Sequence, residues 1–216
     1  MFRPAGSRQP RNSTSSAMSS TPRASASTSS ASGGRRVPTM GERPVVYMVC
    51  TGNAARSPMA AAMLRNLDAD GRLDVRSAGI LTLEGHPIGT RTRSALARHG
   101  LVDHAHRSRQ FRGDDAAEAD LVVVMEPLHL GWVRRNLPEA APITGSLRRL
   151  ARDLSPPEGG ADAGDVGPRV RALELDTLDP EPWEEIVDPG AGEQDDFDRC
   201  SDELRLLVAE LHRRLV

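Results

Sequence analysis

An apolar run, a glycine-containing loop and a helix-favouring segment follow one another between residues 44 and 65. Residues 44–49 are apolar and rich in β-branched side chains, a pattern typical of a buried parallel strand. Residues 58–65 favour a helix, and Ser57 and Pro58 are residue types preferred at its N-cap and first position. The segment therefore predicts a strand, a loop over residues 50–57 and a helix, in that order.

The rest of the chain continues this alternation of strand and helix. Short apolar runs predict three further strands, at residues 75–78, 121–125 and 186–187. Amphipathic patterns predict three further helices, at residues 90–100, 128–136 and 197–215. Strands that alternate with helices imply a parallel sheet covered by helices on both faces, so we expect an α/β fold.

Composition divides the chain into two parts. Residues 1–41 hold six arginines, no acidic residue and almost no large apolar side chain, so they cannot bury enough surface to offset chain entropy. We predict a disordered Ser/Arg-rich tail there; alternatives are a start codon placed too far upstream, with Met40 as the first residue, a targeting peptide, or a nucleic-acid contact. Residues 42–216 are expected to form one domain, with a surface insertion at about 155–182 that is rich in Pro, Gly and acidic residues.

The cysteine count narrows the class of protein. Cys50 and Cys200 are the only cysteines, too few for a disulfide framework and not spaced as a zinc site. No apolar run reaches the roughly 18 residues that span a bilayer. We therefore expect a cytoplasmic protein with no membrane partner and no bound metal. The formal net charge of −2 argues neither for nor against nucleic acid as a partner.

The loop over residues 50–57 carries the candidate chemistry. Free backbone N–H groups and the helix dipole make a strand-loop-helix junction a natural phosphate site. Cys50 at the first position and Arg56 six places on distinguish this loop from an ATP-binding one, which ends in Gly-Lys-Ser. The amides, the dipole and Arg56 all favour the thiolate form of Cys50. A thiolate that faces a bound phosphate can accept a phosphoryl group, while Arg56 grips the phosphoryl oxygens.

The stretch from Val49 to Ser57 resembles the signature of the low-molecular-weight protein tyrosine phosphatases, which share a superfamily with arsenate reductases. Four later motifs occur in the order of that family, at residues 77–79, 106–110, 119–125 and 188–189. The resemblance covers about residues 45–216 apart from the insertion. It implies a compact three-layer fold with a central four-stranded parallel sheet, the phosphate-binding loop after the first strand, and no cofactor or metal.

The resemblance also implies a function and a set of site residues. It implies a phosphomonoester hydrolase that forms a cysteinyl-phosphate on Cys50 and acts on phosphotyrosine in proteins or on small phosphoesters. Asp188 would be the general acid and then the base; Asp179, in a second Asp-Pro pair, competes for this role. The implied phosphate-binding residues are Thr51, Gly52, Asn53, Ala54, Ala55 and Arg56. The implied supporting residues are Asn53, Ser57, Ser77 and His106.

Three positions depart from the family pattern. Ala55 stands where many relatives carry a second cysteine, and Gly190 begins a Gly-Ala-Gly stretch that replaces aromatic residues flanking the substrate ring. The other expected wall, near Leu83, is aliphatic. An arsenate reductase that uses an external thiol, or a phosphoprotein-binding module without hydrolysis, therefore remain alternatives. Nucleic acid is an unlikely partner because the tail lacks interleaved aromatic residues.

Residues outside these motifs are given structural roles. Cys200 is expected to be a core or half-buried thiol on the last helix. Five histidines show no repeated metal-binding spacing and are expected at the surface or at helix ends: His86, His99, His104, His129 and His212. The oligomeric state is left open.

Overall fold

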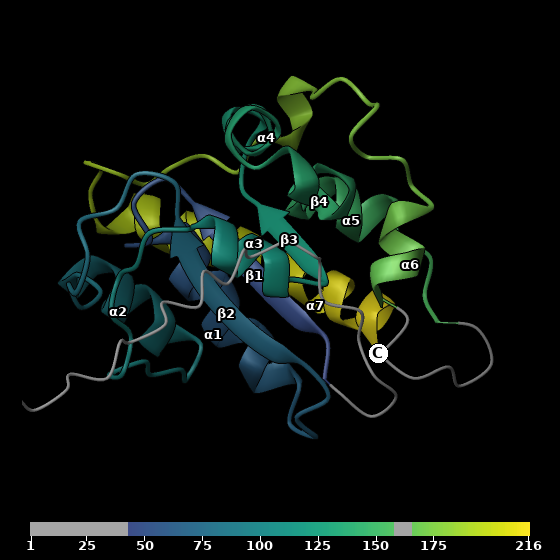
Figure 1. The fold of residues 1–216 in the computed structure, drawn as a ribbon. Coiled ribbons are helices and arrows are strands. Elements are labelled where there is room, and N and C mark those ends of the chain that lie inside the picture. The colour runs from purple at the N-terminus through teal and green to yellow at the C-terminus, as the bar shows by residue number, and fades with distance from the viewer. Residues whose placement is uncertain (1–42, 158–165) are drawn as a thin grey trace, which may run out of the picture. The chain divides into compact units, whose positions relative to one another are not determined.

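A computed structural model describes residues 43–157 and 166–216 of the chain (Figure 1). The tail predicted at residues 1–41 lies outside the described residues. The division into a tail and a domain over residues 42–216 therefore stays a prediction.

Four parallel strands form one sheet in the order β2-β1-β3-β4. Every residue of β1 is buried, as expected of the apolar run at residues 44–49 in the centre of a sheet covered on both faces. The expected α/β fold with four parallel strands is confirmed. The strands are β1 (Val45–Cys50), β2 (Asp74–Gly79), β3 (Leu121–Val124) and β4 (Thr144–Ser146).

Three of the four strands lie where the sequence predicts them, but the fourth does not. Residues 186–187 are not a strand; Ile186 donates one backbone hydrogen bond to the carbonyl of Met125 and forms no ladder. The fourth strand is instead β4, three residues that pair with β3. Its sequence, Thr-Gly-Ser, carries no apolar pattern, so periodicity could not reveal it.

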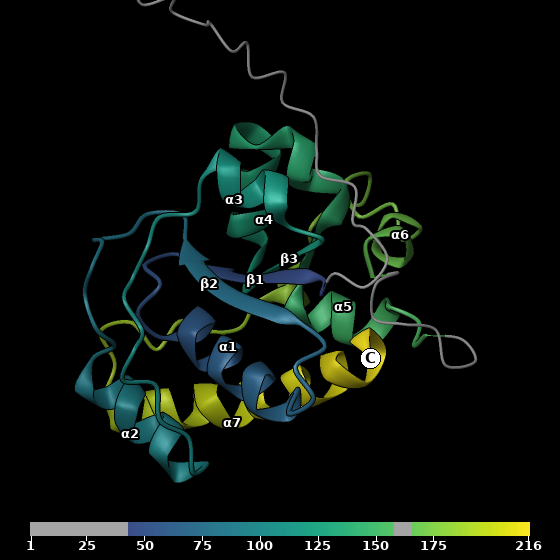
Figure 2. The same ribbon diagram turned by 60° about the horizontal axis from the view of Figure 1, so that its bottom comes forward.

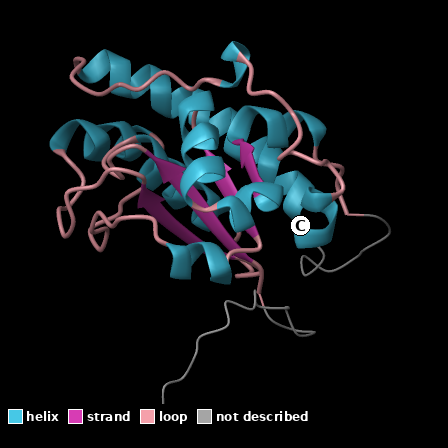
Figure 3. Ribbon diagram, turned by 45° about the horizontal axis from the view of Figure 1, so that its top comes forward, coloured by secondary structure: helices cyan, strands magenta, loops and turns pink. Residues whose placement is uncertain are grey.

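Helices surround the sheet (Figure 3). The three helices predicted at residues 90–100, 128–136 and 197–215 correspond to α2, α4 and α7. The α-helices are α1 (Arg56–Leu67), α2 (Thr90–Arg98), α3 (Gly113–Glu118), α4 (Pro127–Asn136), α5 (Leu147–Asp153), α6 (Val166–Arg171) and α7 (Gln194–Leu215). The 3-10 helices in the described ranges are η1 (Pro138–Ile143) and η3 (Pro182–Glu184).

The first helix starts earlier than predicted. Its N-cap is Ala55, which makes no side-chain capping bond, and Arg56 is already helical. The prediction of Ser57 as N-cap is therefore wrong. Ser57 lies in the first turn, fully buried, and its hydroxyl is directed into the loop before the helix rather than to a backbone N–H of the helix.

Two apolar layers lie on the two faces of the sheet. Val46 and Met48 of β1 pack with side chains of α1, α2, α5, α6 and α7 in the larger core cluster. Tyr47 and Val49, which point to the opposite face because side chains alternate along a strand, pack with side chains of α3, α4 and η1. Figure 2 shows α1, α2 and α7 on one side of the sheet and α3 and α4 on the other. The expected three layers are therefore present.

The segment expected to be a surface insertion contributes to the core. In its described part, Val166, Val170 and Leu175 are at most 3% exposed and belong to the larger core cluster. The expectation of a surface segment is wrong for these three side chains. Val166 and Val170 face the core from the short helix α6, and Leu175 packs there from the turn that follows it. In the described ranges, no helix is long and apolar enough to cross a membrane.

Candidate active site

The loop between β1 and α1 lies at the carboxyl end of the sheet, where open α/β sheets bind ligands. It opens into a cavity of about 720 Å³. Asp188 and Gly190 line the cavity from the segment before α7. Asn53 belongs to the loop but is not among the lining residues, because its side chain is fully buried. The loop residues that line the cavity are Cys50, Thr51, Gly52, Ala54, Ala55 and Arg56.

Cys50 ends β1 and is only 3% exposed. Its Sγ lies 3.0 Å from Ser57 Oγ. Asn53 Nδ2 donates a hydrogen bond to the same Oγ at 3.0 Å, so the hydroxyl proton of Ser57 is free to point at the sulfur or at the carbonyl of Ala78, 3.2 Å away. Ser57 is therefore placed to donate a hydrogen bond to a Cys50 thiolate.

Asn53 holds the loop in its turn. Its φ of 52° lies in the left-handed region that non-glycine residues seldom adopt. Two bonds hold it there: its side-chain oxygen accepts from the backbone N–H of Arg109, and its backbone carbonyl accepts from His106 Nε2, each at 3.0 Å. Burial lowers the pKa of His106 below the ordinary value of 6.5 and so favours the neutral ring, while the bond to Asn53 acts in the opposite direction.

Gly79 lets β2 pass directly beneath the loop. A Cβ at this position would lie 2.5 Å from the carbonyl oxygen of Thr51 and 2.8 Å from the backbone N of Asn53. Both are backbone atoms, so the loop itself would have to move. The strand end is also bonded to the loop, since the backbone N–H of Ile80 donates to the carbonyl of Cys50 at 2.9 Å.

Arg56 is a buried cation at the base of the cavity. It is 1% exposed and lies in the first turn of α1. Nη1 donates to the carbonyl of Ile186 at 3.0 Å, and Nη2 forms ion pairs with Asp188 and, at 3.0 Å, with Glu126. Within the described residues its Nε has no partner. Arg56 is therefore held through Nη1 and Nη2, and its Nε remains able to donate a hydrogen bond to a phosphate oxygen.

The two candidate Asp-Pro pairs lie in different places. Asp188 lines the cavity, is 45% exposed and contacts Arg56. Asp179 instead lies beside Arg134 and Leu175 in a separate small depression. Of these two carboxylates, only Asp188 lies beside the loop.

Two residues of the site were missed by sequence reasoning. Glu126, the N-cap residue of α4, contacts Arg56. His129 is fully buried, and its Nε2 lies 3.0 Å from Thr51 Oγ1. The expectation that His129 is a surface or capping residue is therefore wrong. The available signal was the position of Glu126 directly after the strand at residues 121–125, at the carboxyl end of a parallel sheet.

Comparison with known proteins identifies the family. The family model described as low molecular weight phosphotyrosine protein phosphatase matches residues 45–150. A low molecular weight protein-tyrosine-phosphatase of Streptomyces coelicolor is 34% identical over 164 residues, covering 72% of this chain and 83% of that protein. The chain belongs to the low molecular weight protein-tyrosine-phosphatase family. It is therefore a cysteine-dependent phosphatase, as the loop motif indicates.

A second group of similar proteins acts on a different residue. A protein-arginine-phosphatase of Geobacillus stearothermophilus is 34% identical over 119 residues, covering 53% of this chain and 79% of that protein. The structure of an arginine phosphatase of the same organism superimposes with a TM-score of 0.62, at 28% identity over 80% of this chain and 92% of that one. A tyrosine phosphatase of Escherichia coli K30, solved with sulphate, shares the fold with a TM-score of 0.62 at 24% identity, covering 81% and 100% of the two chains.

Some residues named by the family resemblance contact the loop of this phosphatase, and others do not. Asn53, Ser57 and His106 are hydrogen-bonded to each other or to loop atoms. Ser77 lies on β2 opposite Met48, and within the described residues its side chain makes no hydrogen bond to the loop. Leu83 is 66% exposed and does not line the cavity.

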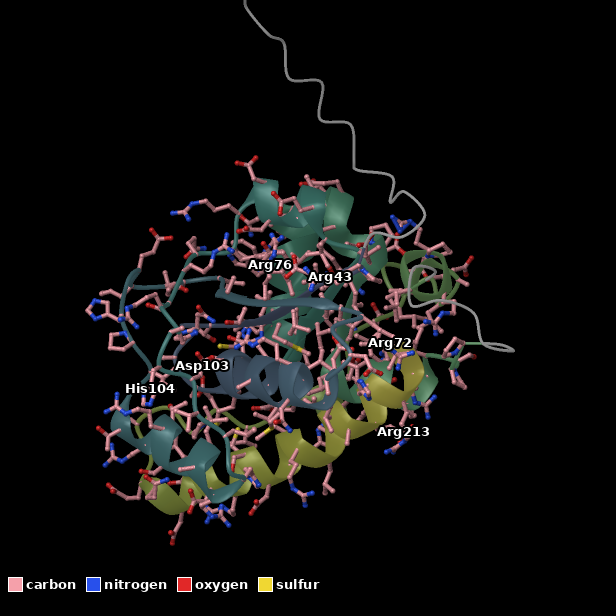
Figure 4. All side chains as sticks on the ribbon, turned by 90° about the horizontal axis from the view of Figure 1, so that it is seen from below. Arg43, Arg72, Arg76, Asp103, His104 and Arg213 are labelled. Atoms are coloured by element: carbon pink, nitrogen blue, oxygen red, sulfur yellow. The ribbon has the colours of Figure 1, made fainter. Side chains whose placement is uncertain are left out.

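The remaining histidines and the second cysteine lie outside the cavity lining. His104, labelled in Figure 4, is exposed in the loop after α2, as expected. His99 is the C-cap residue of α2, so its expected place at a helix end is confirmed. Its ring is half-buried and hydrogen-bonded to Ser201 of α7. Cys200 is a buried thiol, as expected, and burial raises its pKa to about 12. The described part of the chain contains no group of three or more His, Cys, Asp or Glu side chains that could hold a metal ion.

Proposed function

We propose that this phosphatase hydrolyses phosphate monoesters on proteins through a cysteinyl-phosphate on Cys50. The single observation that supports this most is the packing of Cys50, Ser57 and Arg56 around one end of a cavity that Asp188 enters from another segment. A nucleophile, a donor to its sulfur, a phosphate clamp and an acid thus share one small volume.

The first step transfers the phosphoryl group to sulfur. The Cys50 thiolate attacks phosphorus in line, the S–P bond forms and the bond from phosphorus to the leaving oxygen breaks. Arg56 and the loop amides neutralise the charge on the equatorial oxygens. Asp188 donates its proton to the leaving oxygen and becomes a carboxylate. In the second step that carboxylate takes a proton from water, which attacks phosphorus, and the thiolate leaves towards the Ser57 hydroxyl.

We infer phosphotyrosine in proteins as the first substrate class. The family model and the Streptomyces coelicolor relative both carry a tyrosine phosphatase description. Cys50 lines the cavity and is only 3% exposed, which suits a substrate side chain long enough to reach it. The cytoplasmic location and the lack of a membrane or nucleic-acid partner stay predictions.

Phosphoarginine in proteins is a second candidate substrate; its phosphoryl group is bonded to nitrogen, so Asp188 would protonate a leaving nitrogen in place of the oxygen. The Geobacillus stearothermophilus relative is described as a protein-arginine-phosphatase. The cavity lining supports this candidate, because it contains small residues such as Ala54 and Gly190 and, apart from Phe197, no aromatic side chain among the described residues. Such walls do not sandwich an aromatic ring, and a phosphorylated guanidinium needs no ring stacking.

The test is a panel of phosphorylated peptides carrying tyrosine, arginine or serine, together with para-nitrophenyl phosphate. We expect Cys50→Ser to abolish turnover of every substrate. Asp188→Asn should lower kcat by about 10²–10⁴-fold on substrates with poor leaving groups. Asp179→Asn, the matched control in the other Asp-Pro pair, should retain wild-type turnover. If Asp179→Asn loses turnover and Asp188→Asn keeps wild-type turnover, the assignment of the acid is reversed.

Two additions to this panel, arsenate with a measurement of free thiol and a phosphopeptide-binding assay, separate the two other functions considered. Thiol consumption that depends on arsenate, without hydrolysis of para-nitrophenyl phosphate, would indicate an arsenate reductase. Tight phosphopeptide binding without turnover would indicate a binding module. We expect neither, because each relative named above is described as a phosphatase.

A further inference from the structure

Arg56 has a second carboxylate partner that the mechanism above does not use. Glu126 Oε1 lies 3.0 Å from Arg56 Nη2 and 3.0 Å from His129 Nε2. The Glu126 side chain is 19% exposed, against 45% for Asp188. Glu126 is thus the more buried of the two carboxylates that contact the clamp arginine.

The carboxylate of Glu126 is not used to cap its own helix. An acidic N-cap side chain ordinarily accepts a hydrogen bond from a backbone N–H of the first helical turn. Glu126 is the N-cap residue of α4 and makes no such bond. Its carboxylate is turned towards Arg56 and His129 instead, so the ordinary structural reason for an acid at this position does not apply.

His129 connects Glu126 to the phosphate loop. Its ring is fully buried, and Nε2 lies 3.0 Å from both Glu126 Oε1 and Thr51 Oγ1. A carboxylate only accepts hydrogen bonds, so Nε2 carries the ring proton. Arg56 Nη2 in turn donates to Thr51 Oγ1 at 3.4 Å. The four side chains therefore form a closed circuit of polar contacts beside the cavity.

Glu126 stays negatively charged over the pH range in which a phosphatase works. The hydrogen bond from His129, opposed by burial and helped by the charge of Arg56, lowers the pKa of Glu126 to about 2. Asp188, by contrast, must gain and lose a proton in each turnover of the mechanism above. The two carboxylates on Arg56 thus have different proposed roles: Asp188 transfers a proton to the leaving group, and Glu126 stays ionised beside Arg56.

We propose that Glu126 and His129 are positioning residues that hold the Arg56 guanidinium and the Thr51 hydroxyl in place while Asp188 leaves Arg56 to protonate the leaving group. The proposal rests on the proposed roles of Arg56 and Asp188. When Asp188 turns to the leaving oxygen, Glu126 is the one described carboxylate that still contacts Arg56. Without it, the guanidinium is held by the Ile186 carbonyl and by the longer contact to Thr51.

The test compares four variants with the wild type in hydrolysis of para-nitrophenyl phosphate and in inhibition by inorganic phosphate. Glu126→Gln keeps the shape and removes the charge; Glu126→Asp keeps the charge; His129→Phe removes the link to Thr51. Glu118→Gln is the matched control, because Glu118 pairs with Arg76 away from the cavity.

A shift of Arg56 in these variants should change both the hydrolysis of para-nitrophenyl phosphate and the inhibition by inorganic phosphate. We expect Glu126→Gln to lower kcat/KM by about 10²-fold and to weaken inhibition by phosphate about tenfold. Glu126→Asp should recover part of both losses, and His129→Phe should lie between Glu126→Gln and the wild type. Glu118→Gln should match the wild type in both, and the urea midpoint of Glu126→Gln should remain within the range of the control.

Two outcomes would overturn the proposal. One is a Glu126→Gln variant with wild-type kcat/KM and phosphate inhibition. The other is a loss of activity that matches the loss of folded protein in urea and is not recovered by Glu126→Asp, which would make the role purely structural. An inactive wild type in the same assay would instead refute the proposed function, so the two failures are distinguishable.

Discussion

Asn53 has a backbone conformation that few side chains accept, and its neighbours hold it there. A left-handed non-glycine residue is strained unless its surroundings fix it. His106 and the backbone of Arg109 supply those bonds from a segment more than 50 positions away in the chain. The shape of the loop before α1 therefore depends on a buried histidine outside the loop.

The burial of His106 predicts a loss of stability in mild acid. Burial lowers the pKa of His106 below 6.5, so below that value the unfolded chain binds more protons than the folded one. The stabilisation is complete above pH 6.5 and is lost as the pH falls through the lowered value. Arg65 and Arg107 act in the same direction on the pKa, and Asp103 opposes them.

The measurement is urea unfolding at about pH 7.5 and about pH 5.5, with NMR titration of the His106 ring. His106→Asn should lose less stability between the two pH values than the wild type does. His104→Asn, which alters an exposed neighbour, should behave like the wild type. An NMR titration of His106 at or above 6.5 would contradict the account.

Whether a site residue could be predicted from the sequence depends on how far away in the chain its contact partners lie. Cys50, Asn53, Arg56 and Ser57 are predictable because a single strand-loop-helix unit holds them. Glu126 and His129 were missed because they contact Arg56 and Thr51 across roughly 70 positions, which no local pattern encodes.

At the scale of elements, the short helix η3 holds the segment that carries Asp188. Glu184 is fully buried and is paired with Arg149 of α5, and its other oxygen accepts from Ser146 Oγ at 2.5 Å. Two residues later the carbonyl of Ile186 accepts from Arg56. Anchoring Glu184 thus fixes the start of the segment that ends at Asp188.

Removing this anchor should affect both stability and activity. Glu184→Ala leaves Arg149 buried without its main partner, and we expect a loss of about 3–5 kcal/mol in the free energy of unfolding. Where folded protein remains, kcat/KM should also fall, because Ile186 and Asp188 shift. Urea unfolding and hydrolysis of para-nitrophenyl phosphate measure the two effects. Glu185→Ala, an exposed neighbour, is the control; equal effects of the two variants would contradict the account.

Strands and helices were predictable to different degrees. The apolar centres of β1 and β3 and the stripes of α2, α4 and α7 carry their own periodicity. The strand β4 does not, because three residues pair with β3 and owe their conformation to that neighbour. Residues 186–187 have the composition of a strand but form only one backbone bond of that kind, to Met125 just after β3.

At the scale of the whole chain, the residues that line the cavity lie between positions 50 and 197, within the described part of the chain. The tail predicted at residues 1–41 contributes no group to the proposed mechanism. A chain that begins at Met40 should therefore keep the kcat, KM and urea midpoint of the full chain. A marked loss of activity on deletion would mean that the division into tail and domain is wrong.

The central claim is that phosphate passes through the sulfur of Cys50. The most direct measurement is acid quenching of Asp188→Asn during turnover of para-nitrophenyl phosphate, followed by mass spectrometry of the peptide that contains Cys50. That substrate needs little help from an acid, so the intermediate forms, and its hydrolysis is slow without the Asp188 base. We expect one phosphoryl group on Cys50, and none in Cys50→Ser. Turnover by the wild type without phosphate on Cys50 in the quenched variant, or turnover that survives Cys50→Ser, would contradict the account.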